Sequence, residues 1–184
     1  SEIVLGPVAA SRWSYATAKL LTERYLAGLD GLHWTVVRPF NFVGPFMDFM
    51  PGVDGEGIPR VLANFSTALV RGESLKLVNG GVAKRCFTSV HDAVDFMFCL
   101  FAAGECAFSQ AFNVGNAANE VSIAELAQLM RSVYAVIKGV HENEVPGVEE
   151  IPGEEYYGKG YDDSLRRLPS VEKAERLVGF KAKI

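Results

Sequence analysis

The stretch RWSYATAKLLTERYLAGLDGLHWTVVRPFNFVGP, residues 12–45, places a helix pattern directly before a strand pattern. Residues 12–26 are good helix formers with their apolar side chains along one stripe, which predicts an amphipathic helix. Residues 34–37 are a short aromatic and β-branched run that stops at Arg38-Pro39, so we expect a buried strand there. The glycine- and proline-bearing segment 41–57 follows as a loop, and its length suggests a functional role.

Helix and strand patterns continue to alternate along the chain, which predicts an α/β fold. Further strands are predicted over residues 75–78, 84–90 and 111–114, and further helices over 59–70, 92–103, 170–178 and the stretch that follows Ser122. Ser122 and Glu125 have the spacing of a capping box. The helix over 92–103 is almost entirely apolar, so we expect it to be buried, with Phe96, Phe98 and Phe101 in the core. Residues 142–155 are acidic and predict a surface loop.

Composition narrows the class of protein. Of the 184 residues, 49% are hydrophobic and 22% are charged, and the net charge of -4 argues against nucleic acid as a partner. Cys86, Cys99 and Cys106 form no CxxC pair, and the three histidines show no ligand spacing, so neither a disulfide framework nor a metal site is expected. A reducing, cytoplasmic setting fits this cysteine usage. The longest apolar stretch, 93–103, is interrupted by Asp95 and is far shorter than the ~20 residues of a membrane span.

Tyr15 and Lys19 are candidate catalytic residues, because side chains four positions apart lie on the same face of a helix. An ammonium group beside a phenol stabilises the phenolate, and such a pair can take a proton from an alcohol while hydride leaves the same carbon. The YxxxK spacing alone also fits a surface tyrosine beside a solvated lysine, so the surrounding sequence has to decide.

That surrounding sequence resembles the extended short-chain dehydrogenase/reductase family. The resemblance starts with Tyr15-Ala-Thr-Ala-Lys19 followed by Arg38-Pro-Phe-Asn41-Phe-Val-Gly44-Pro45, and it covers nearly the whole chain. Within that family the loop 47–54 and the tail 156–167, YYGKGYDDSLRR, look like UDP-glucuronate decarboxylases of the UDP-apiose/UDP-xylose synthase type. Other motifs that match in family order are Lys76-Leu-Val-Asn-Gly80-Gly81, Lys84-Arg85-Cys-Phe-Thr-Ser-Val-His-Asp92 and Phe112-Asn-Val-Gly115-Asn116.

The resemblance implies an enzyme that uses NAD to oxidise C4 of UDP-glucuronate and then releases carbon dioxide from the resulting β-keto acid. It implies Tyr15 as the base and Lys19 as its partner and cofactor contact. Arg167 matches the position of a proposed proton donor, although arginine is a poor acid and stabilisation of the enolate is an equally good role. Family contacts to the UDP-sugar fall on Asn41, Arg60, Lys76, Arg85 and Tyr161, with Arg12 as a candidate for the sugar carboxylate.

Each of these binding residues has a structural alternative. The alternative is a solvated surface charge for Arg60 and Lys76, a turn cap for Asn41, and core packing for Tyr161. For Arg12 the alternative is solvation at the start of a helix, and for Cys86 beside Arg85 it is a small buried filler.

The resemblance also predicts how the chain is organised. We expect an incomplete, doubly wound Rossmann-type sheet in which residues 1–45 belong to the NAD-binding fold. Residues 46–184 would then form mainly the UDP-sugar-binding region, with 84–103 returning to the core fold. A strand followed by a glycine-rich GxGxxG turn does not occur in the sequence, so we expect the amino-terminal half and the final helix to be missing.

Three functions remain open at this point. The first is the decarboxylase, either of the apiose/xylose type or of the lipid A modification type that forms a UDP-4-keto-pentose. The second is another NAD-dependent sugar-nucleotide epimerase or dehydratase on the same scaffold. The third is a non-catalytic UDP-sugar-binding or dimerisation module. By resemblance the intact protein would be a homodimer.

Overall fold

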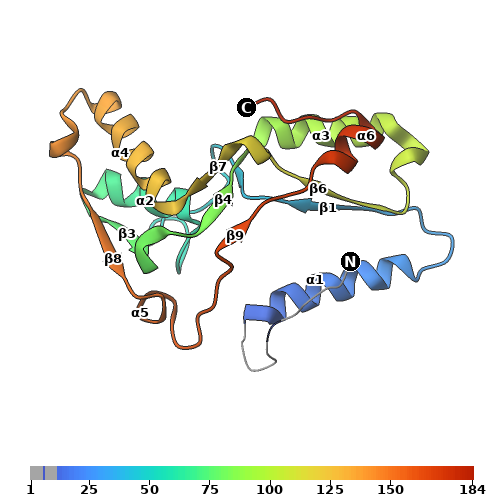
Figure 1. Cartoon of the computed structure of the whole chain (residues 1–184), viewed down its shortest axis with the longest axis horizontal. Helices are drawn as coiled ribbons and strands as arrows, with labels where there is room; N and C mark the ends of the chain where they lie inside the picture. Colours follow the sequence, from blue (N-terminus) through green and yellow to red (C-terminus); the bar gives the residue numbers. More distant parts are fainter. Residues whose placement is uncertain (1–5, 7–11) are drawn as a thin grey trace.

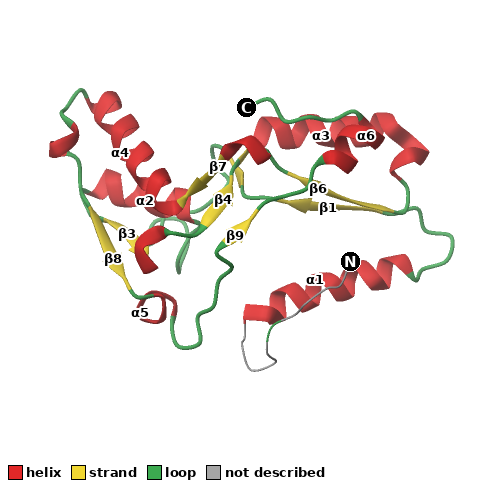
Figure 2. Ribbon diagram, viewed as in Figure 1, coloured by secondary structure: helices red, strands yellow, loops and turns green. Residues whose placement is uncertain are grey.

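The computed structural model describes Gly6 and residues 12–184, with only the backbone of Arg12. Its strands form a row of small sheets that runs across the molecule, from β3–β8 through β7–β4–β9 to β1–β6 (Figure 2). Helices flank this row on both sides, so the described chain has the predicted α/β architecture.

The first core surrounds a pair of parallel strands. β1 (Thr35–Pro39) pairs with β6 (Gln110–Val114), and α3 (Val90–Ala103) and α6 (Glu172–Val178) lie on one side of them while α1 (Arg12–Ala27) lies on the other (Figure 1). The buried side chains of this core are Phe96, Leu100, Ala107, Phe112, Val114, Ala174 and Phe180. α1 is tied to β1 by the ion pair between Glu23 and Arg38, and the pKa of Glu23 is lowered chiefly by the hydrogen bond from the Arg38 guanidinium.

The prediction that α3 is buried throughout is wrong for one of its faces. Phe96 is fully buried, but Phe98 and Phe101 are 68% and 79% exposed. A helix turns by roughly 100° per residue, so these two side chains point away from Phe96. α3 packs its Phe96 face against Phe112 and Phe180. Among the described residues, no element covers the opposite face enough to bury Phe98 or Phe101.

The second core lies at the other end of the row. β3 (Leu75–Val78) pairs in parallel with β8 (Val148–Ile151), and α2 (Val61–Arg71) and α4 (Ile123–Lys138) pack against them. The capping box of α4 is confirmed, because Ser122 Oγ accepts from the Glu125 N–H at 3.1 Å and Glu125 accepts from the Ser122 N–H at 2.7 Å. The buried side chains here are Phe65, Leu69, Leu75, Leu77, Leu126, Ala127, Ala135 and Val145.

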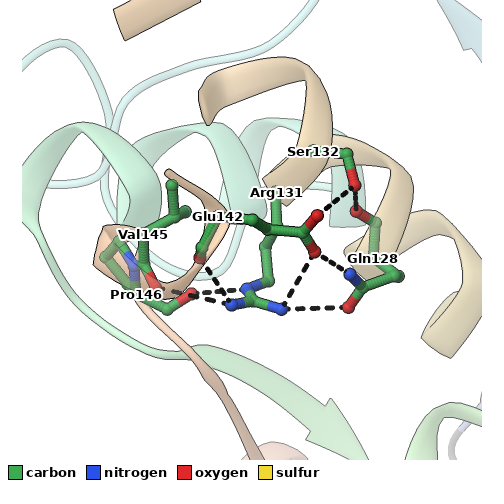
Figure 3. A network of polar contacts seen from close by, with 6 residues as sticks. All are labelled: Gln128, Arg131, Ser132, Glu142, Val145 and Pro146. Carbon is green, nitrogen blue, oxygen red and sulfur yellow. Dashed lines mark hydrogen bonds and ion pairs between the residues drawn. The ribbon is translucent and has the colours of Figure 1, made fainter. Parts of the chain in front are cut away.

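The acidic segment 142–155, predicted as a loop, contains ordered elements. These are a short 3-10 helix (Glu142–Glu144), β8 and α5 (Gly153–Tyr157). Arg131 of α4 fixes the start of the segment, since its guanidinium donates to the carbonyls of Pro146 at 2.7 Å and Glu142 at 3.3 Å (Figure 3). β8 was missed because its glutamates remain exposed and its pairing with β3 uses the backbone, which leaves no hydrophobic alternation in the sequence.

Short strands connect the two cores. β4 (Lys84–Cys86) pairs antiparallel with β7 (Glu120–Ser122) and parallel with β9 (Arg166–Arg167), and β2 (Phe42–Val43) pairs in parallel with β5 (Thr88–Ser89). The single strand predicted over 84–90 is therefore two strands. Thr88, the first residue of β5, is fully buried. Its hydroxyl donates to the Phe40 carbonyl at 2.8 Å and accepts from the Asn116 N–H at 3.1 Å.

The segment 180–184 packs along the start of α3. The carboxylate of Asp92, which is buried, accepts hydrogen bonds from the backbone N–H groups of Lys183 and Ile184, each at 3.0 Å. None of the helices in the described part of the chain is long and apolar enough to cross a bilayer.

Candidate functional site

A cleft of about 390 Å³ lies where the connecting strands meet the second core. This volume is in the range of small-molecule binding sites, roughly 300–1,000 Å³. Its walls come from the loop after β1, the start of α2, and parts of β3, β4, α5 and β9. Among the predicted site residues, the cleft is lined by Asn41, Arg60, Lys76, Arg85, Tyr161 and Arg167.

Asp163 joins three of these side chains. Its Oδ2 lies 2.8 Å from Arg85 Nη2 and accepts from the Tyr161 hydroxyl at 3.2 Å, and its Oδ1 accepts from Arg167 Nη2 at 3.2 Å. The Arg85 side chain is 6% exposed, whereas that of Arg167 is 47% exposed. Asp163 therefore neutralises a buried guanidinium and orients a second one that still reaches solvent.

Arg60 is committed to the loop that precedes it. Its Nε lies 2.9 Å from Asp48 Oδ2, its Nη1 donates to the Phe42 carbonyl at 2.9 Å, and its Nη2 donates to the Met47 carbonyl. Burial raises the pKa of Asp48, but hydrogen bonds from Phe49 and from Arg60 outweigh that effect and hold this pKa below its ordinary value. Three of the five guanidinium N–H donors of Arg60 are thus used within the protein. The main role of Arg60 in this structure is therefore to hold the preceding loop in place.

Asn41 and Lys76 also have partners inside the protein. The Asn41 amide donates to the Cys86 carbonyl at 2.7 Å, and its backbone adopts a φ of 42°. Lys76 forms an ion pair with Glu149 across the β3–β8 pair. Cys86 is completely buried and burial raises the pKa of its thiol, so it is the small filler that was the alternative for this residue.

Three tyrosines form an aromatic wall along the cleft. The rings of Tyr157 and Tyr161 are stacked with centroids 4.5 Å apart, and Tyr156 meets Tyr157 edge-on at 4.8 Å. Asn64 fixes Tyr156 by donating to its hydroxyl at 2.9 Å. Gly153 makes room for this wall, because a Cβ at that position would lie 2.5 Å from the Tyr161 ring. The cleft therefore offers both aromatic faces and cationic groups.

Tyr15 and Lys19 lie apart from the cleft. The Lys19 ammonium is 5.4 Å from the centroid of the Tyr15 ring, as expected for neighbours on one helix face. Tyr15 is 72% exposed, and none of the described residues that line the cleft comes from α1. The side chain of Arg12, predicted to contact the sugar carboxylate, lies outside the described residues.

Sequence reasoning did not single out Asp163, Tyr156, Tyr157 or Phe46 as site residues, although all four line the cleft. The first three belong to the tail 156–167 that carried the resemblance. The separation of four residues between Asp163 and Arg167 was the available signal for an ion pair, but nothing local links either of them to Arg85.

Comparison with known proteins identifies the family of this chain. The model of the NAD dependent epimerase/dehydratase family matches residues 1–115. The chain belongs to this family. Its α/β, Rossmann-type fold is supported by a solved member of the same fold, the PbgP3 protein from Burkholderia pseudomallei. That structure superposes with a TM-score of 0.78 at 29% identity, over 100% of this chain and 52% of that one.

Curated relatives with high similarity share one name. Over its whole length the chain is 46% identical to UDP-D-apiose/UDP-D-xylose synthase 1 of Arabidopsis thaliana, and 44% identical to UDP-D-apiose/UDP-D-xylose synthase of Oryza sativa subsp. japonica. It covers 48% and 47% of these proteins. The chain thus spans about half the length of the curated relatives it matches.

Proposed function

We propose that this chain is the catalytic-pair and substrate-binding part of an NAD-dependent UDP-glucuronate decarboxylase of the UDP-apiose/UDP-xylose synthase type. The observation that carries the proposal is the Arg85–Asp163–Arg167 cluster with Tyr161 in one cleft. The 46% identity to a UDP-apiose/UDP-xylose synthase supports the choice of substrate.

The cleft suits an anionic nucleotide-sugar. Lys76 and Arg167 supply cationic donors for the diphosphate and the glucuronate carboxylate, and a guanidinium group matches such oxygens in a bidentate fork. The stacked Tyr157–Tyr161 pair supplies a flat apolar surface for the nucleoside end. Arg85 is held by Asp163 and by the Ser164 carbonyl at 2.8 Å, so its role is to keep this wall of the pocket rigid. Arg167 is more exposed and is the better placed of the two to contact a ligand.

Tyr15 and Lys19 have the chemistry expected at the sugar end of the substrate. A phenol and an ammonium on one open helix face fit the hydroxyl groups of a nicotinamide ribose, and the exposure of Tyr15 leaves the pair accessible. NAD, when bound, would supply the hydride acceptor for C4. Tyr15 would accept the proton from the C4 hydroxyl while Lys19 stabilises the phenolate.

Decarboxylation then needs little from the protein beyond electrostatics. A ketone at C4 is β to the C5 carboxylate, so the electron pair of the breaking carbon–carbon bond flows into the ketone and forms an enolate. Arg167 would stabilise this enolate by donating hydrogen bonds to its oxygen. Protonation of the enolate carbon completes the step, and the fate of the C4 ketone determines whether UDP-apiose, UDP-xylose or a 4-keto-pentose is released.

The test is to supply UDP-glucuronate and NAD to the protein that contains this chain and to measure carbon dioxide and nucleotide-sugar products. Carbon dioxide with UDP-apiose and UDP-xylose is the expected result. Carbon dioxide with an accumulating UDP-4-keto-pentose would assign the lipid A modification type instead. Intact or epimerised UDP-glucuronate without carbon dioxide would refute the decarboxylase and leave the epimerase or dehydratase alternative.

A homodimer and a cytoplasmic location remain predictions. The dimer is supported by the surface of α1, where Leu21 and Tyr25 are 66% and 67% exposed. A helix that presents large apolar side chains to water is typical of a helix that packs against a partner.

A further inference from the structure

Phe46 is a bulky residue held in the open beside the cleft. It lines the cleft, its side chain is fully exposed at 103%, and its backbone φ is 61°. A left-handed φ is uncommon for residues other than glycine and is an outlier for a bulky aromatic residue. Such a conformation persists where the surroundings enforce it, and it is concentrated at ligand-binding sites.

The flanking backbone enforces this conformation from both sides. On the amino-terminal side, Gly44 is pressed against α3, since a Cβ there would lie 2.4 Å from Val90 Cγ1. On the carboxyl-terminal side, Arg60 binds the Met47 carbonyl and the Asp48 carboxylate. Pro45, directly before Phe46, fixes its own φ. The loop is therefore anchored around Phe46, and the exposed ring is a consequence of that anchoring.

We propose that Phe46 stacks on the planar nitrogen heterocycle of a nucleotide bound at the cleft. Two ligands of the proposed function, on which this inference rests, carry such rings: the UDP-sugar has uracil, and NAD has nicotinamide and adenine. Every such ring has a π face, and stacking on an aromatic side chain removes the two facing ring surfaces from water. Because the loop is already fixed, little conformational freedom is lost when the ligand binds.

The experiment measures binding by calorimetry, separately for UDP and for NAD, in the protein that contains this chain. Phe46→Ala and Phe46→Gly are expected to weaken one of the two ligands about tenfold, whereas Phe46→Tyr keeps the ring and stays within about twofold. A loss with UDP identifies uracil as the stacked ring, and a loss with NAD identifies a ring of NAD, which a repeat with ADP-ribose assigns to adenine if the loss persists and to nicotinamide if it disappears.

Two controls separate stacking from folding. Glycine adopts a positive φ without strain, so Phe46→Gly should be at least as stable to heat as Phe46→Ala. Phe101→Ala removes another exposed aromatic ring, 79% exposed on α3 and outside the cleft lining, and should leave both affinities unchanged. If the alanine and glycine variants bind both ligands as the wild type does, the role of Phe46 is wrong. If the wild type itself binds neither ligand, the proposed function fails, and this inference fails with it.

Discussion

Replacing Asp163 by asparagine tests the centre of the cleft. The substitution keeps the shape of the side chain but removes the charge that balances Arg85, whose side chain is 6% exposed. Leaving a buried charge without its partner costs about 3–5 kcal/mol. The Asp163 side chain is 23% exposed, and the asparagine oxygen still accepts hydrogen bonds. We therefore expect a loss below this range, about 2 kcal/mol in the free energy of unfolding.

Urea unfolding, followed by the fluorescence of Trp13 and Trp34, measures this loss. With a slope of about 2 kcal/mol per molar urea, the midpoint should fall by roughly 1 M. Asp162→Asn is the matched control, because Asp162 is the exposed neighbour and its replacement should shift the midpoint by less than about 0.25 M. The affinity for UDP-glucuronate should fall as well, since Arg167 loses the contact that orients it. Equal midpoints and equal affinities for the two variants would refute the view of Asp163 as the organiser of the cleft.

Three other predictions follow from contacts described above. Tyr15→Phe should lower turnover of UDP-glucuronate at least ~100-fold, because the base is lost. It should leave the affinity for UDP unchanged, because α1 does not contribute to the described lining of the cleft. A parallel loss of UDP affinity in a titration would contradict this separation. Thr88→Val should lower the free energy of unfolding, measured in urea, by about 2–3 kcal/mol, because two buried hydrogen bonds disappear. In the control Thr22→Val the lost hydroxyl also bonds a carbonyl but is exposed, so the loss should be less than about 0.5 kcal/mol. Similar losses at both sites would show that burial is not the cause. Asp48 has a folded pKa below its ordinary 3.8, so its contribution to stability is complete above about pH 5 and is lost as the pH falls through the folded pKa. The difference in unfolding free energy between the wild type and Asp48→Asn should therefore vanish on acidification. A difference that stays constant down to the acid-unfolding region would count against the Arg60 contact.

The sequence predicted elements well where the evidence was local. The helix over 12–26, the strand over 75–78 and the capping box at Ser122 depend on propensity and spacing within one element, and the structure has all three. β8 depends on pairing with a strand more than 70 residues away, and its glutamates hide it from any pattern based on hydrophobicity.

The same distinction applies to the site. Motif matches brought Asn41, Arg60, Lys76, Arg85, Tyr161 and Arg167 forward, and the structure places them around one cleft. The sequence could not reveal that Arg60 and Asn41 donate hydrogen bonds to backbone carbonyls, because those carbonyls belong to residues up to 45 positions away. It also overestimated the burial of α3, since an apolar helix is buried only as far as other elements cover it.

The pairing of β9 with β4 has a consequence for how the protein is made. Arg85 reaches Asp163 and Ser164 only after about 80 further residues have been synthesised. Until then a nascent chain on the ribosome carries an arginine without its carboxylate and one wall of the cleft without the other. Because long-range pairings of this kind form late, the two walls of the cleft can meet only after the segment 156–167 has been synthesised. Premature termination before Tyr161 would release chains that contain the YxxxK helix but lack both the Tyr161 ring and the carboxylate that holds Arg85.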